Sequence, residues 1–95
     1  MLGTVKFFER HKGWGYIVPD DETIGDVYVH WSMLPDDCEH VVERYDDSEG
    51  KYIRTPRRWL NDGQRVRFDV TDTGRGPRAA NLKVVKQEWQ YEEYV

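Results

Sequence analysis

Among its 95 residues the sequence contains one cysteine, three histidines and no long apolar run. Because a disulfide needs two thiols, Cys38 cannot form one within the chain, which agrees with a reducing compartment. No apolar stretch approaches the roughly 18 residues of a membrane span, and no segment resembles a cleavable signal. His11, His40 and Cys38 lack the spacing typical of a metal site. These absences predict a cytoplasmic protein with no membrane attachment, no metal and no other cofactor.

The sequence also lacks an excess of positive charge, since 14 lysines and arginines face 18 aspartates and glutamates and give a net charge of −4. This balance argues against indiscriminate binding to duplex nucleic acid. Acidic residues gather at positions 36–49 and 88–93, whereas basic residues flank the first glycine-rich segment and dominate positions 51–58 and 65–86. Because charges are screened over about 8 Å at physiological salt, the basic segments can still attract phosphate locally.

Two short segments, residues 12–17 and 27–31, place rings in alternation with small or aliphatic residues. The alternating rings are those of Trp14, Tyr16, Tyr28 and His30. Residues two apart share a face of a β-strand, so two paired strands would carry all four rings on one surface. Gly13 and Gly15 would leave that surface open to the close approach of a base. The pattern predicts stacking of unpaired bases on this surface.

Turn residues divide the rest of the chain into short segments with strand periodicity. Strands are expected at residues 2–10, 14–19, 26–30, 64–71 and 78–86, with one helical turn at 31–34. No segment has the apolar spacing of a long amphipathic helix. Five short strands without such a helix predict an all-β barrel or sandwich.

The middle of the chain has a mixed signal. Residues 41–45 and 51–54 flank a polar turn at 46–50, which predicts a β-hairpin. A disordered acidic loop is the alternative, because Asp, Ser, Glu and Gly also favour disorder. Three uses remain open for this segment: a basic wall through Arg54, Arg57 and Arg58, an acidic flap that competes with nucleic acid, or a protein-binding surface.

Several blocks of the chain together resemble the cold-shock domain family. They are Gly3–Phe8, Lys12–Ile17, Asp26–His30, Gly63–Phe68 and Arg75–Asn81, in the family's order. The resemblance covers residues 2–34 and 60–85 and implies a five-stranded antiparallel barrel of the OB type that binds single-stranded RNA and DNA. The RNA-recognition motif shares the start of the Lys-Gly-aromatic-Gly pattern, but it needs two packing helices and places its other aromatic strand earlier.

The resemblance also implies which residues bind nucleic acid. The base-stacking positions fall on Phe7, Phe8, Trp14, Tyr16, Tyr28, His30 and Trp31. Polar and phosphate contacts fall on Lys6, Lys12, Asp26 and Arg75. The chain departs from the family in having Phe7 where Trp is usual and larger rings where Phe is common, which preserves stacking and can shift base preference. Two alternatives are that the rings form part of the core and that His30 is a metal ligand.

These observations predict a cold-shock domain at residues 1–86, with a family-atypical insert at 35–59 and an acidic, aromatic tail at 87–95. The tail is expected to be disordered, to pack on the insert or to pair with a partner. The expected function is binding of single-stranded RNA or DNA with low sequence specificity, as an RNA chaperone or transcription antiterminator. The alternative is a protein-interaction module that uses the insert and tail. Because no nucleophile, carboxylate pair or metal cluster indicates catalysis, we expect a protein that is not an enzyme. We also expect a monomer or a weak dimer.

Overall fold

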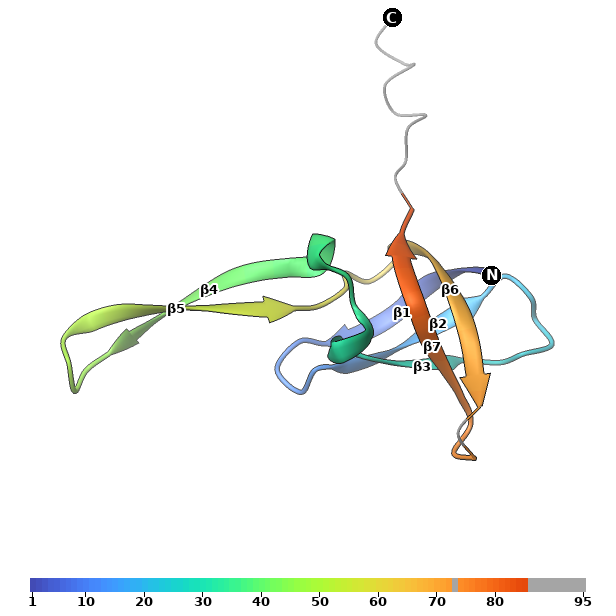
Figure 1. The fold of residues 1–95 in the computed structure, drawn as a ribbon, viewed down its shortest axis with the longest axis horizontal. Coiled ribbons are helices and arrows are strands. Elements are labelled where there is room, and N and C mark those ends of the chain that lie inside the picture. The colour runs from blue at the N-terminus through green and yellow to red at the C-terminus, as the bar shows by residue number, and fades with distance from the viewer. Residues whose placement is uncertain (73, 86–95) are drawn as a thin grey trace, which may run out of the picture.

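The computed structural model describes residues 1–72 and 74–85. The described part of the chain contains seven strands and two short 3₁₀ helices (Figure 1). In chain order they are β1 (Leu2–Glu9), β2 (Trp14–Pro19), β3 (Val27–His30), η1 (Trp31–Met33), η2 (Asp36–Cys38), β4 (Glu39–Asp46), β5 (Lys51–Arg58), β6 (Arg65–Asp72) and β7 (Pro77–Val84). The predicted tail at 87–95, and the predicted end of the last strand at Lys86, lie outside the described residues.

Five of these strands close into a barrel in the order β1-β2-β3-β7-β6, with β6 returning to pair with β1. All neighbouring pairs are antiparallel except β3 and β7, which are parallel where Tyr28 faces Arg78. Strands β4 and β5 form a separate two-stranded sheet that projects from the barrel (Figure 1). The predicted all-β barrel of the OB type is therefore confirmed.

The barrel interior is filled by one apolar cluster. Its buried members are Val5, Phe8, Ile17, Val27, Val29, Leu34, Cys38, Leu60, Val66, Phe68, Ala79 and Leu82. Ile17, Val27 and Val29 alternate with the aromatic residues of β2 and β3, as predicted for the inward positions of these strands. Cys38 ends η2 and is buried within this core.

The middle segment is a regular hairpin, so the alternative of a disordered loop is wrong. Its register runs from Glu39 opposite Arg58 to Asp46 opposite Lys51, which makes it longer than the predicted 41–54. At the tip, the Asp46 carboxylate accepts hydrogen bonds from the Ser48 N–H at 3.0 Å and the Ser48 hydroxyl at 2.6 Å. These bonds close the polar turn locally, which favours order over the disorder that composition suggests.

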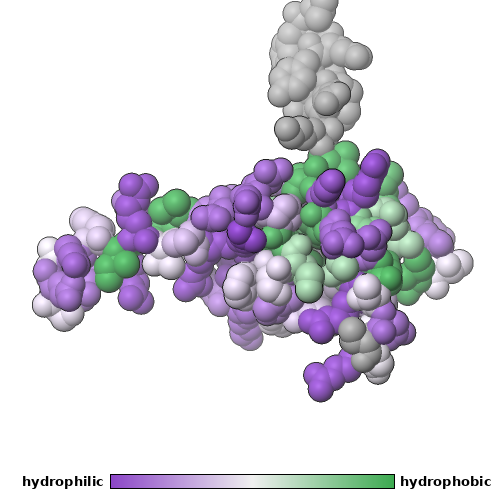
Figure 2. Space-filling model, viewed as in Figure 1, coloured by the Kyte–Doolittle hydropathy of each residue, from purple (hydrophilic) through white to green (hydrophobic). Residues whose placement is uncertain are grey.

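The hairpin as a whole carries no net formal charge. It contains five acidic and five basic residues, and Figure 2 shows hydrophobic residues interrupting the hydrophilic ones along it. Ion pairs join Lys51 to Glu49 at 2.9 Å and Arg54 to Glu43 at 3.5 Å. The acidic block of the sequence is therefore partly neutralised by arginine and lysine side chains from the same hairpin.

Within the described ranges, no helix is both long enough and apolar enough to cross a membrane.

Candidate functional site

Four rings from three adjacent strands form a continuous cluster on the outside of the barrel, which we call the aromatic surface: Phe7, Trp14, Tyr16 and Tyr28. The Phe7 ring centroid lies 5.8 Å from those of Trp14 and Tyr16. The Tyr28 centroid lies 5.9 Å from Tyr16 and 6.4 Å from Trp14. Most of these contacts are edge-to-face or tilted, an arrangement that holds neighbouring rings in place while leaving π-faces available.

Strand register explains why these rings meet. Tyr16 lies opposite Tyr28 in the β2–β3 pair and opposite Phe7 in the β1–β2 pair. Residues directly opposite each other in an antiparallel pair share a face. The tyrosines and Trp14 are partly exposed, whereas their neighbours in the same strands are largely inside the barrel. The prediction that these rings lie outside the core is confirmed.

The stacking role expected of Phe8 does not fit its position, because Phe8 is 8% exposed and belongs to the core. The register shifts by one residue between Val5 and Phe7, which makes Lys6 the extra residue of a β-bulge. This bulge reverses the alternation, so Phe7 faces outward beside Tyr16 and Phe8 faces inward. We therefore remove Phe8 from the candidate site.

From the sequence, Gly13 and Gly15 were expected to leave the surface open to the close approach of a base. In the structure, both glycines instead make room for neighbouring side chains of the protein. A Cβ atom on Gly15 would lie 2.8 Å from the Phe8 Cα and 2.9 Å from its ring. Gly13 has a φ of +81°, and a Cβ there would lie 2.5 Å from the Trp31 ring. Gly15 thus makes room for Phe8 inside the barrel, and Gly13 makes room for Trp31 at the turn.

His30 and Trp31 extend the aromatic surface at the end of β3. Their ring centroids are 5.6 Å apart, and the Trp31 N–H donates to the Gly13 carbonyl at 2.9 Å. The Ser32 N–H donates to His30 Nδ1 at 3.3 Å. The Ser32 hydroxyl lies 2.8 Å from the same nitrogen, so Ser32 holds the orientation of the imidazole ring through Nδ1.

The four charged residues of the predicted site surround this surface unequally. Lys6, at the bulge, forms an ion pair with Asp26 at 2.9 Å, and both side chains are about half exposed. Lys12 lies in the turn between β1 and β2, and Arg75 lies in the loop between β6 and β7; both are exposed. Because exposed ion pairs contribute little to stability, Lys6 can exchange Asp26 for another anion at small cost.

Two cation–π contacts add residues that the predicted site does not include. The Arg78 guanidinium lies 4.9 Å from the Tyr28 ring centroid, and that of Arg10 lies 4.9 Å from the Trp59 centroid. His40 stacks on Trp59 with centroids 3.9 Å apart. The group of Arg10, His40 and Trp59 could be found from the sequence only through the register of the hairpin, which places His40 and Trp59 on one face. Predicting that register requires the exact position of the turn.

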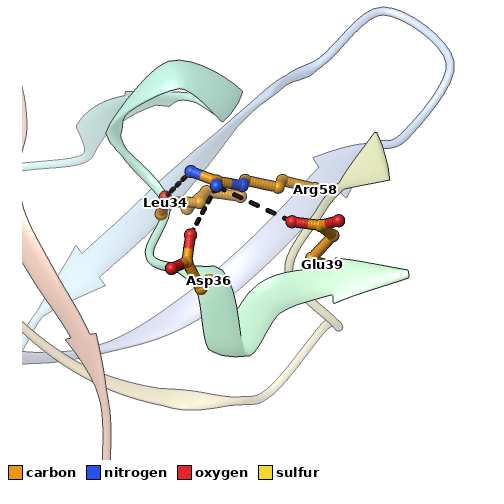
Figure 3. A network of polar contacts seen from close by, with 4 residues as sticks. All are labelled: Leu34, Asp36, Glu39 and Arg58. Carbon is orange, nitrogen blue, oxygen red and sulfur yellow. Dashed lines mark hydrogen bonds and ion pairs between the residues drawn. The ribbon is translucent and has the colours of Figure 1, made fainter. Parts of the chain in front are cut away.

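Arg58 fixes the base of the hairpin to the barrel (Figure 3). Its guanidinium donates to the Leu34 carbonyl at 2.9 Å and to the Asp36 carboxylate at 2.5 Å, and it lies 3.7 Å from the Glu39 carboxylate. Leu34 is in the core, so this one side chain connects the barrel, η2 and β4. A guanidinium suits this role because its planar donors can serve several acceptors at once.

A metal centre has no support in residues 1–72 and 74–85, where no group of three or more His, Cys, Asp or Glu side chains could hold an ion. The candidate site consists of the aromatic surface with charged side chains at its border, among them the Lys6–Asp26 pair.

Comparison with known proteins decides the family. The model of the 'Cold-shock' DNA-binding domain matches residues 1–85. The chain belongs to this family. Among curated cold-shock relatives, a "Cold shock-like protein" of Thermotoga maritima is 37% identical over 86 residues, which cover 90% of this chain and 100% of the relative. One of Aquifex aeolicus is 36% identical, covering 87% and 91%. The "Cold shock-like protein CspG" of Escherichia coli K12 is 35% identical, covering 86% and 90%.

Membership in the cold-shock family supports nucleic-acid binding as the general function of this chain, and the domain is not an enzyme. The matched residues include all of the barrel and the hairpin, and therefore the whole aromatic surface.

Proposed function

We propose that this cold-shock domain binds single-stranded RNA and DNA by stacking unpaired bases on the aromatic surface. The observation that carries the proposal is the cluster of Phe7, Trp14, Tyr16 and Tyr28, partly exposed rings on three adjacent strands. His30 and Trp31 continue the surface, and Lys6, Lys12, Asp26 and Arg75 supply polar and phosphate contacts at its edges. We assign binding to residues 1–86, with 35–59 as a segment atypical for the family.

Stacking explains low sequence specificity. Every base has a π-face, and each stacked base contributes about 1–3 kcal/mol, so three or four bases suffice for useful affinity. Bases in a duplex are already stacked and paired, so they can reach the rings only if the duplex opens, which costs free energy. The surface therefore selects unpaired strands over paired ones.

The same selectivity supports a role as an RNA chaperone or transcription antiterminator. A protein that binds only the open strand shifts the equilibrium between a hairpin stem and the open strand by mass action. This shift requires no nucleotide hydrolysis, in agreement with the non-enzymatic domain.

The experiment that tests the proposal is a tryptophan-fluorescence titration with oligo-dT, oligo-U and a matched duplex, each at two salt concentrations. Trp14 and Trp31 lie in the proposed site, so single strands should quench the emission saturably and duplex should not. Each phosphate contact should contribute a slope of about −0.7 to the plot of log affinity against log salt. Absence of quenching by single strands at micromolar protein would overturn the proposal.

A second candidate function is binding of a protein partner through the hairpin. The observation that favours it is the exposure of large apolar side chains there: Val41, Val42, Tyr45 and Tyr52. Replacing residues 42–53 with a short turn separates the two functions. Binding through the aromatic surface survives this change, whereas an activity carried by the hairpin is lost.

A further inference from the structure

A groove of about 470 Å³ lies between the barrel and the base of the hairpin. One side is formed by the β1–β2 turn, residues 10–13, and the other by residues 56–58 of β5. Trp31, which is 49% exposed, lies in the groove and also at the end of the aromatic surface. The groove therefore begins where the row of stacking rings ends.

The hairpin borders this groove through Glu39, Pro56, Arg57 and Arg58; His40 and Trp59, which lie beside Arg57, are not among its lining residues. Arg57 lies opposite His40, and the Trp59 N–H donates to the Cys38 carbonyl at 3.2 Å, so the ladder continues to Trp59. Arg57, His40 and Trp59 thus share one face of the hairpin. Arg10 lies over the Trp59 ring, which connects that face to the β1–β2 turn.

Most charged side chains that line the groove are positive, and several of them form no ion pair within residues 1–72 and 74–85. Of the three arginines in β5, Arg54 pairs with Glu43 and Arg58 is occupied by Leu34, Asp36 and Glu39. Arg57 is exposed and forms no ion pair within residues 1–72 and 74–85.

Arg10 and Lys12, across the groove, form no ion pair within the same ranges. Among residues 1–72 and 74–85, the one carboxylate that lines the groove is that of Glu39, which lies 3.7 Å from Arg58. Three cations from two separate elements are therefore available to an anionic ligand.

We propose that this groove binds the phosphodiester backbone of a single strand as it leaves the aromatic surface past Trp31, with Arg57 as the phosphate contact supplied by the hairpin. The inference rests on the proposed function, since the same strand occupies both sites. Guanidinium groups bind phosphate through paired N–H donors, and Arg10 from the β1–β2 turn and Arg57 from β5 both line the groove. The hairpin therefore lengthens the binding site beyond the barrel.

The test compares oligonucleotide length with the charge at position 57. An oligo-dT of about four nucleotides is short enough to occupy the aromatic surface alone, and one of about twelve is long enough to reach the groove. Arg57→Ala should weaken binding of the long strand about three- to tenfold and leave the short strand unchanged. The salt slope for the long strand should fall by about 0.7. Arg57→Lys should restore most of the loss.

Arg54→Ala is the matched control, because Arg54 is on the same strand but pairs with Glu43 and does not line the groove. It should leave both affinities unchanged. If Arg57→Ala weakens binding of the short and long strands equally, or of neither, the proposal that the groove binds the strand is wrong. The proposal that bases stack on the aromatic surface would be unaffected by this result. If wild-type protein binds neither strand, both proposals fall.

Discussion

Phe7 and Phe8 are adjacent in β1, yet Phe7 is 37% exposed on the aromatic surface and Phe8 is 8% exposed in the barrel core. The bulge at Lys6 produces this separation by shifting the register against β2. Two identical side chains therefore have different roles at neighbouring positions.

Substitution should separate these roles. Phe8→Ala should lower the free energy of unfolding by about 3–5 kcal/mol, because it opens a cavity in the core. Phe7→Ala should weaken oligo-dT binding by about 1–3 kcal/mol and cost less stability. Urea unfolding and fluorescence titration measure the two quantities. If Phe8→Ala fails to fold, Phe8→Leu retains most of the volume and should bind with unchanged affinity. A larger loss of affinity in Phe8→Leu than in Phe7→Ala would contradict the assignment.

The tyrosines of β2 and β3 should be essential for affinity but not for folding. Tyr16→Ala and Tyr28→Ala should each weaken oligo-dT binding by about 1–3 kcal/mol, because each removes a stacking ring. The matched control is Tyr52→Ala, since Tyr52 is 69% exposed in the hairpin and contacts Tyr45. Calorimetry should show unchanged affinity in this variant. Wild-type affinity in both barrel variants would remove the aromatic surface from the mechanism.

The pair formed by Asp20 and Arg65 should make stability depend on pH. Both carboxylate oxygens of Asp20 accept hydrogen bonds from the Arg65 guanidinium at 2.7 Å, which lowers the pKa of Asp20 below its ordinary value of 3.8. A lowered pKa in the folded state means that the contribution is complete above pH 3.8 and is lost as the pH falls through the folded pKa.

Asp20→Asn should therefore lower the Tm at neutral pH, and its difference from the wild type should narrow in acid. Asp62→Asn, at an exposed position outside this pair, is the control and should keep the wild-type Tm at neutral pH. A Tm difference for Asp20→Asn that stays constant from neutral pH to below 3.8 would exclude the pair as its source.

Cys38 should react slowly with thiol reagents in the folded protein. It is 3% exposed, and burial, with a smaller contribution from Asp37, raises the pKa of its thiol. The thiolate is the reactive form, so both access and ionisation are reduced. Labelling with a disulfide-exchange reagent at pH 8 should be slow in buffer and fast in denaturant. Equal rates in the two conditions would show that the thiol is accessible in the native state.

The sequence by itself determined the strands of the barrel and the outward position of most rings. Trp14, Tyr16 and Tyr28 alternate with Ile17, Val27 and Val29 at the period of a strand, so local pattern alone distinguished the outer face from the inner one. The order of the motif blocks can be read directly along the chain, and it was sufficient to identify the family.

The tertiary structure decided the features that depend on contacts between strands and not on the pattern within one strand. A bulge at Lys6 forms only against β2, so the different positions of Phe7 and Phe8 could not follow from the alternation of β1 alone. The groove depends on Arg58, which fixes the base of the hairpin to the barrel by donating to the Leu34 carbonyl. The second relationship joins residues far apart in the chain, because packing of the hairpin base against the barrel brings Arg57 of β5 and Arg10 of the β1–β2 turn to the same groove.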